Sequence, residues 1–175
     1  MKTVSHERLL EALSYNKETG VFRWKISICN VRCGDAAGNF SGIYPTIQLD
    51  GYRTRAHRWA LFYVYGEWPS NEVDHIDGNP LNNRIDNLRD VTRSVNAKNI
   101  RLSSRNTSGV SGVVYHKPSS RWKAEIKKSG RSICLGYFRD WFDAVCRRKS
   151  AEKLMGFHPN HGRLPRPINE PDLVA

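Results

Sequence analysis

The segment from Glu72 to Ile100, EVDHIDGNPLNNRIDNLRDVTRSVNAKNI, restricts the fold of this chain more than any other part of the sequence. It predicts a short strand at residues 72–76 and another at residues 88–91. The loop between them is dense in Asp, Gly, Asn and Pro, which favour turns. A helix is expected to begin near Ser94. The predicted order is therefore strand, loop, strand and helix.

The residues before this segment predict a small antiparallel sheet between two helices. Residues 5–14 place leucines on one face of a short helix, which Ser5 is expected to cap. Residues 21–26 alternate as a strand, and residues 44–55 predict a hairpin that turns at Asp50 and Gly51. Residues 56–65 are apolar with helical spacing, which predicts a buried helix.

The residues after this segment predict a three-stranded sheet packed on one helix. A polar stretch at residues 101–109 has the composition of a linker. Three strand-like runs follow, at residues 110–116, 121–128 and 132–138. Residues 140–156 then predict a helix. The side chains expected along its face are Phe142, Val145, Cys146 and either Lys149 or Ala151.

We therefore predict an α+β protein in four parts. Residues 1–55 form an N-terminal helix and β-rich segment, and residues 56–104 form the core that contains the strand, loop, strand and helix. Residues 105–160 form the module of three strands and a helix, and residues 161–175 form a C-terminal tail.

The chain carries a formal net charge of +11, which favours a polyanionic partner such as nucleic acid or an acidic membrane face. Lys and Arg outnumber Asp and Glu by 6 to 5 in residues 1–50, by 7 to 6 in residues 51–100 and by 15 to 6 in residues 101–175. Nine of the eleven excess charges therefore lie in the segment 101–175. Regular strand and helix patterns there favour a folded binding module over a merely solvated basic tail.

Neither a membrane span nor a secretory signal is expected. No apolar run approaches the ~18 residues that a membrane helix needs, and the N-terminus lacks the apolar core of a signal peptide. We expect a soluble cytoplasmic protein without disulfides among Cys29, Cys33, Cys134 and Cys146. A zinc site at Cys29 and Cys33 is disfavoured, because structural zinc needs four ligands and no second pair follows at a suitable spacing.

Asp74, His75, Asn87 and Asn96 carry the side chains that phosphodiester hydrolysis needs. A neutral histidine can take a proton from an attacking water. An aspartate and an amide oxygen are hard ligands that suit Mg²⁺ or Mn²⁺ and leave positions for water and phosphate. Asn87 is expected to bridge backbone groups of the loop and fix the orientation of His75. Alternatively, residues 74–87 are an ordinary Asn- and Asp-rich surface loop with a solvated His75.

Residues 55–100, with the pattern HRWALFYVYGEWP followed by VDHIDGNPLNNRIDNLRDVTRSVNAKN, resemble the HNH endonucleases of the phage and intron homing type, which have a ββα-metal core. The resemblance implies that His75 is the general base, that Asp74 and Asn96 bind one divalent ion, and that Asn87 braces the loop. In other branches the last motif residue is often histidine, so Asn96 suggests a harder metal site than one that prefers zinc. His57 is expected to pack or to contact the DNA backbone, and no chemistry is assigned to the remaining histidines.

Residues 108–156 resemble the AP2/ERF DNA-binding domain in SGVSGVVY, RWKAEI, LGYF and the helix that follows. If Trp122, Ala124 and Ile126 face the helix, alternation places Arg121, Lys123, Glu125 and Lys127 on the opposite face, where DNA can be contacted. His116 and Arg131 are added to this expected DNA-binding set, as is His57. The arginines of the plant-type first strand and the Arg-x-Trp of the third are missing here, so the resemblance does not extend to sequence preference. The alternative is that this basic sheet binds only the phosphates of the DNA backbone.

Together these features predict a site-specific nicking endonuclease that acts on double-stranded DNA. We expect a monomer, with a dimer as the alternative, no protein partner, and the cytoplasm of a bacterial host as the location if the gene belongs to a phage. A catalytically inactive DNA-binding regulator is the main alternative function. RNA binding or cleavage is a further alternative that the basic aromatic module favours only weakly.

Overall fold

The computed structural model describes residues 4–28 and 30–164 and divides the chain into two compact units, Met1–Arg93 and Ser94–Ala175. The predicted core at residues 56–104 therefore contributes to both units. Each unit is built around its own cluster of buried apolar side chains.

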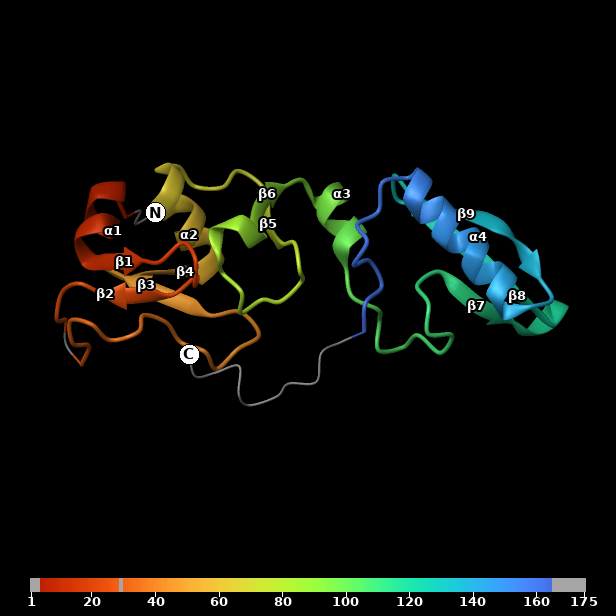
Figure 1. Cartoon of the computed structure of the whole chain (residues 1–175), viewed down its shortest axis with the longest axis horizontal. Helices are drawn as coiled ribbons and strands as arrows, with labels where there is room; N and C mark the ends of the chain where they lie inside the picture. Colours follow the sequence, from red (N-terminus) through yellow and green to blue (C-terminus); the bar gives the residue numbers. More distant parts are fainter. Residues whose placement is uncertain (1–3, 29, 165–175) are drawn as a thin grey trace. The chain divides into compact units, whose positions relative to one another are not determined.

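Among its described residues, 4–28 and 30–93, the first unit contains three two-stranded antiparallel sheets and two α-helices (Figure 1). In chain order the elements are α1 (His6–Ala12), β1 (Leu13–Tyr15), β2 (Phe22–Trp24), β3 (Thr46–Leu49), β4 (Tyr52–Arg55), α2 (Ala56–Tyr65), β5 (Glu72–His75), a 3₁₀ turn (Ile85–Asn87) and β6 (Leu88–Val91). The sheets pair β1 with β2, β3 with β4 and β5 with β6.

The predicted hairpin, capped helix and apolar helix are all confirmed in the first unit. Asp50 and Gly51 both have positive φ, 49° and 82°, as a two-residue hairpin turn requires. Ser5 caps α1 by accepting a hydrogen bond from Arg8 N. However, residues 13–15 leave the predicted helix and form β1, because Leu13 and Tyr15 are buried by pairing with β2.

The core of the first unit is centred on α2. Trp59 is fully buried, and its indole Nε1 donates to Ile47 O at 3.1 Å, which fastens α2 to β3. Leu88 belongs to the same cluster and lies opposite His75 in the β5–β6 ladder. The apolar core therefore fixes the position of the hairpin that carries Asp74 and His75.

The second unit is a three-stranded antiparallel sheet in the order β7-β8-β9, with one long helix packed on it (Figure 1). Its elements are α3 (Arg93–Asn96), a 3₁₀ turn (Ala97–Asn99), β7 (Val113–His116), a 3₁₀ turn (Lys117–Ser119), β8 (Arg121–Lys128), β9 (Arg131–Phe138) and α4 (Trp141–Leu154). The helix expected near Ser94 is short, since only four α-helical residues precede the 3₁₀ turn.

The face of α4 that packs on the sheet agrees with the prediction at Val145 and Ala151 and differs from it at Phe142 and Cys146. Phe142 is 63% exposed and Cys146 is also exposed, whereas Ala144, Arg148, Ala151 and Glu152 are buried. The prediction followed apolar side chains, but Arg148 can be buried because it pairs with Glu152 at 2.9 Å and donates to a backbone carbonyl of β8 at 2.6 Å.

The expectations of no membrane span and no disulfides can be compared with the described residues alone. Among the described helices none is both long and apolar enough to cross a bilayer. Cys33, Cys134 and Cys146 are free thiols, while Cys29 lies outside the described residues. Most of the predicted C-terminal tail, residues 165–175, also lies outside them.

Candidate active site

The β5–β6 hairpin places Asp74 and His75 at the end of a strand. In the ladder Asp74 lies opposite Arg89, and His75 lies opposite Leu88. Their side chains are only 7% and 5% exposed. The regular strand ends at His75, as required if two adjacent residues are to reach one site despite strand alternation.

Asp74 forms an ion pair across the hairpin with Arg89. Both Nε and Nη2 of the guanidinium donate to Asp74 Oδ2, at 2.9 and 2.7 Å. These are charge-assisted hydrogen bonds to a carboxylate in a largely water-excluded position. Arg89 therefore supplies the positive charge beside the carboxylate that was predicted to bind a metal ion.

His75 is enclosed by aromatic side chains and an amide. Its Nε2 lies 3.2 Å from Asn83 Oδ1, and its ring centroid lies 5.0 Å from that of His57 and 6.1 Å from that of Tyr44. Burial lowers the pKa of His75 from its ordinary value, although the Asn83 hydrogen bond and the nearby Asp77 carboxylate oppose this shift. His75 is therefore neutral at neutral pH and can accept a proton.

Asn87 braces the loop between β5 and β6. Its Oδ1 accepts from Asp77 N at 3.0 Å, and its Nδ2 donates to Asp77 Oδ1 at 3.0 Å and to Asn82 O at 2.8 Å. Its backbone carbonyl also accepts from Ile76 N. These contacts match the bridging of loop backbone groups expected for Asn87, but they hold the loop that follows His75 rather than the imidazole itself.

The Asp77 carboxylate is kept charged by the same loop. Its partial burial raises the pKa of Asp77, but the Asn79 backbone amide and the side chains of Asn82 and Asn87 outweigh this and lower the pKa. The loop therefore folds around a charged oxygen acceptor, which explains why this short segment is so rich in asparagine.

His57 lies in the first turn of α2 and is 3% exposed. Its ring is edge-on to His75 and to Tyr44, at centroid distances of 5.0 and 5.5 Å. Burial lowers the pKa of His57 to about 3, with smaller contributions from His75, Arg55 and Arg58. Of the two roles expected for His57, packing is the one that the structure shows, and DNA contact would require its exposure.

Asn96 belongs to the second unit, at the end of α3. Its pairing with Asp74 around one metal ion therefore stays a prediction. Within residues 4–28 and 30–164, no group of three or more His, Cys, Asp or Glu side chains is arranged to hold a metal. Asp74 offers one buried carboxylate, which fits Mg²⁺ or Mn²⁺, ions that keep several waters and use substrate phosphate as ligands. It does not fit a closed four-ligand zinc site.

The sheet of the second unit has the alternation that was expected. Ala124 and Ile126 are buried and Trp122 packs against the core cluster, so Arg121, Lys123, Glu125 and Lys127 lie on the other face. Arg121 and Lys127 are exposed, whereas Lys123 Nζ contacts Glu125 Oε2 at 2.6 Å. The centre of this face is therefore a neutral ion pair.

The remaining residues expected to bind DNA lie at the margins of this sheet. His116 Nδ1 lies 2.8 Å from Ser119 Oγ, and its ring is 5.2 Å from that of Tyr137. Arg131 is exposed and begins β9 opposite Lys128, so it follows the alternation of the buried side chains rather than that of Lys127. The structure does not bring Arg131 into the same row as Lys127.

Three residues beside the candidate site were not predicted from the sequence: Tyr44, Asn83 and Arg89. A signal existed for Arg89, because the two predicted strands place it near Asp74 once the hairpin register is known. Nothing distinguishes Asn83 from the other asparagines of its loop in the sequence alone. Tyr44 lies far from His75 along the chain and reaches it only through the tertiary fold.

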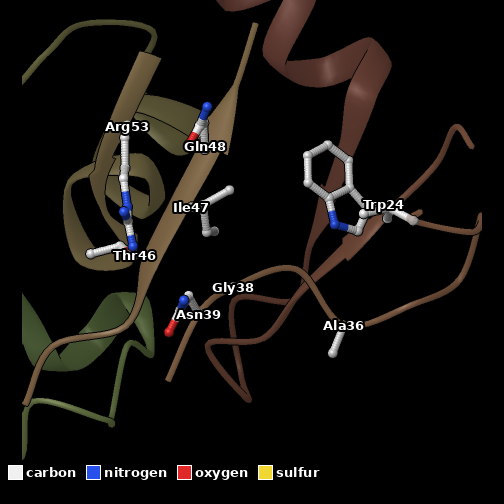
Figure 2. Close-up of a pocket in the computed structure, with 9 residues that line it drawn as sticks. Trp24, Ala36, Gly38, Asn39, Thr46, Ile47, Gln48 and Arg53 are labelled. Carbon is white, nitrogen blue, oxygen red and sulfur yellow. Dashed lines mark hydrogen bonds between the residues drawn. The ribbon is translucent and has the colours of Figure 1, made fainter. Parts of the chain in front are cut away.

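The first unit also has a hollow of about 340 Å³ beside β2, β3 and β4. Trp24, Ile47, Gln48 and Arg53 are among its lining residues (Figure 2). None of the residues predicted for catalysis or metal binding lines it, so we keep the β5–β6 hairpin as the candidate active site.

Comparisons with known proteins agree with this choice. Residues 54–98 match the model of an HNH endonuclease family, a region that covers less than half of the chain. Protein 3.8 of Escherichia phage T7 is 39% identical over 59 residues, which are 34% of this chain and 49% of that protein. The chain thus spans about half the length of this curated relative. No solved structure gives a significant match. Residues 54–98 match an HNH endonuclease domain, and Asp74, His75, Asn87 and Asn96 lie within this range.

Proposed function

We propose that this chain is a DNA endonuclease that uses His75 as general base and one divalent ion, Mg²⁺ or Mn²⁺, held by Asp74 and Asn96. The observation that carries the proposal is a buried histidine, kept neutral by its surroundings, next to a buried aspartate inside the HNH-matched region. This combination gives a proton acceptor beside a hard oxygen ligand.

The chemistry follows from the properties of these side chains. Neutral His75 removes a proton from water, whose oxygen forms a bond to phosphorus while the bond from phosphorus to the 3′ oxygen breaks. The leaving 3′ oxygen takes up a proton from solvent, so the products are a 5′-phosphate and a 3′-hydroxyl. A divalent ion, when bound, stabilises the negative charge that develops on the phosphoryl and leaving oxygens. Asn87 keeps the loop after His75 in one conformation through its bonds to Asp77 and Asn82.

In this proposal the second unit binds double-stranded DNA. Its strands β7, β8 and β9 followed by α4 are the element order that the resemblance to AP2/ERF domains predicts, which supports this part of the proposal. Arg121 and Lys127 are exposed on the sheet face opposite α4, where they can reach phosphates or base edges. The basic excess of the segment 101–175 supports this assignment.

The finer proposal is a site-specific nickase of the homing type. One HNH-matched segment per chain provides one histidine base, which cuts one strand per binding event. A monomer would then leave a nick, and a double-strand break would need two copies.

A catalytically inactive DNA-binding regulator is a second candidate, and one observation favours it. Asp74 is already paired with Arg89 in this structure, as expected for a site that has exchanged its metal ion for a protein cation. The regulator would keep the basic sheet and lose hydrolysis.

A plasmid relaxation assay separates the two candidates. We expect the purified protein to convert supercoiled DNA to the open circle with Mg²⁺ or Mn²⁺ and not with EDTA. His75→Ala should remove cutting and leave DNA affinity nearly unchanged, because a general base acts in the transition state. His158→Ala is the matched control, since no chemistry is assigned to this histidine.

Supercoiled DNA that stays intact with either ion, while the protein still shifts it on a gel, would establish the regulator instead. Loss of DNA binding in His75→Ala would contradict the role given to this residue. Competition by RNA that exceeds competition by duplex DNA would reassign the substrate class.

A further inference from the structure

We propose that Asn83 is a positioning residue that fixes both the orientation and the tautomer of His75. Its amide is the hydrogen-bond partner of the imidazole Nε2, at 3.2 Å. The inference rests on the proposed function in one respect, namely that His75 is the base. No role was predicted for Asn83 from the sequence.

The direction of the Asn83 amide follows from its other neighbour. Its Nδ2 lies 3.4 Å from the carbonyl oxygen of Leu81, which can only accept a hydrogen bond. A flipped amide would place two oxygens face to face there. The Oδ1 atom therefore faces His75, and since an amide oxygen only accepts, the imidazole must donate from Nε2.

This direction assigns the two nitrogens of His75. In a neutral imidazole one nitrogen carries the proton and the other carries the lone pair. With the proton on Nε2, the lone pair is on Nδ1, and Nδ1 is the atom that takes a proton from water. When Nδ1 becomes protonated, Nε2 keeps its hydrogen bond to Asn83, which strengthens because the donor is now charged.

Asn83 can hold His75 because it is itself held from the N-terminal side of the unit. Its side chain is buried, and its backbone oxygen accepts from the Tyr15 hydroxyl at 2.6 Å. The turn before β2 packs on the same peptide, since a Cβ at Gly20 would collide with the backbone of Asn83 and Arg84. Gly20 also needs its positive φ of 74°.

The two asparagines of the loop therefore act on different parts of the site. Asn87 ties the loop to itself through Asp77 and Asn82, whereas Asn83 ties the imidazole to β1 through Tyr15. Loss of Asn87 is expected to loosen the loop. Loss of Asn83 is expected to leave the loop folded and free the proton of His75 to occupy either nitrogen.

The test is a long-range ¹H–¹⁵N correlation spectrum of histidine-labelled protein at pH 8, where the ring is neutral. The wild type should show His75 with its proton on Nε2, and Asn83→Leu should show a mixture of both tautomers. Asn83→Asp keeps an accepting oxygen towards Nε2 and should keep the Nε2 proton, although its second oxygen faces the Leu81 carbonyl oxygen and should lower the stability of the loop. Asn82→Ala is the matched control, since its side chain contacts Asp77 rather than His75, and it should keep the wild-type tautomer.

Cleavage rates give the second readout. In single-turnover assays Asn83→Leu should cleave about 10- to 100-fold more slowly, the range typical for loss of a supporting hydrogen bond, with DNA affinity unchanged.

A wild-type His75 with its proton on Nδ1, or an unchanged tautomer in Asn83→Leu, overturns the positioning role. Such a result leaves the endonuclease proposal intact if the wild type still cuts DNA. A wild type that does not cut, yet shows the predicted tautomers, overturns the endonuclease proposal alone.

Discussion

Acidification should destabilise the first unit through His57. Burial lowers the pKa of His57 to about 3 in the folded protein, whereas the unfolded chain has a value near 6.5. As the pH falls below 6.5, His57 becomes protonated in the unfolded state but stays neutral in the folded state. The stability that neutral His57 contributes is therefore complete above pH 6.5 and is lost progressively towards pH 3.

The size of this loss follows from the two pKa values. Between pH 6.5 and pH 5, protonation of His57 stabilises the unfolded chain by about 2 kcal/mol, because each pH unit below the pKa contributes about 1.4 kcal/mol. His57→Phe keeps an aromatic ring against Tyr44 and does not titrate. We expect the free energy of unfolding to fall by about 2 kcal/mol more in the wild type than in His57→Phe between pH 7.5 and pH 5.

Urea titrations followed by NMR measure this difference, because backbone amide signals of α2 report the first unit separately from the second. His161, whose pKa burial also lowers, lies in the second unit and does not enter this comparison, and His75 is present in both proteins. Equal losses of stability in wild type and variant would refute the reasoning, since they would mean that His57 gains water or a hydrogen-bond partner in solution.

Four further predictions concern the two units. Arg89→Gln should tighten Mn²⁺ binding to the DNA-free protein by roughly two- to fivefold, because the Arg89 guanidinium competes with the ion for Asp74 and a partly exposed ion pair contributes up to about 1 kcal/mol. Electron paramagnetic resonance measures the affinity, and Arg84→Gln is the matched control. A weaker or unchanged affinity in Arg89→Gln would contradict competition between Arg89 and the ion. The fall of the cleavage rate on acidification should have its midpoint below pH 6.5, since burial lowers the pKa of His75 from its ordinary value; a rate already half lost at pH 6.5 would show an exposed imidazole. Lys127→Gln should reduce the slope of log affinity against log salt by about 0.9 if the side chain contacts a phosphate, and an identical slope removes it from the interface. Gly112→Ala should cost the second unit at least about 2 kcal/mol in urea unfolding, because the new Cβ would meet a β8 carbonyl oxygen and a buried guanidinium at a positive φ; a wild-type midpoint would contradict this.

Much of the secondary structure could be predicted because local patterns determine it. The turn at Asp50 and Gly51 and the apolar helix at residues 56–65 have strong local signals, and the structure contains both as expected. The secondary-structure predictions are wrong where tertiary contacts outweigh the local pattern. Residues 13–15 continue a helical pattern but become a strand because β2 is available to pair with them.

The buried face of α4 shows why apolar side chains alone can mislead. Apolar spacing selected Phe142 and Cys146, and both are exposed. Beside Ala144 and Ala151, the buried positions are occupied by a charged pair, Arg148 and Glu152, whose burial depends on partners from β8 and from the segment that contains His161. No property of the helix sequence taken by itself indicates those partners.

The candidate site divides in the same way. Asp74 and His75 could be selected because their chemistry and spacing are unusual together, whereas Asn83 and Arg89 acquire importance only from their distances to them. Asn96 was also selected by spacing, and its role stays a prediction because it belongs to the other unit.

The pair formed by Arg89 and Asp74 has a consequence for assembly of the protein. A buried carboxylate with no neighbouring cation would oppose folding until a cation bound to it. Here the hairpin contains its own counter-charge from the moment its two strands pair. The hairpin can therefore fold with its carboxylate already neutralised, before any divalent ion binds.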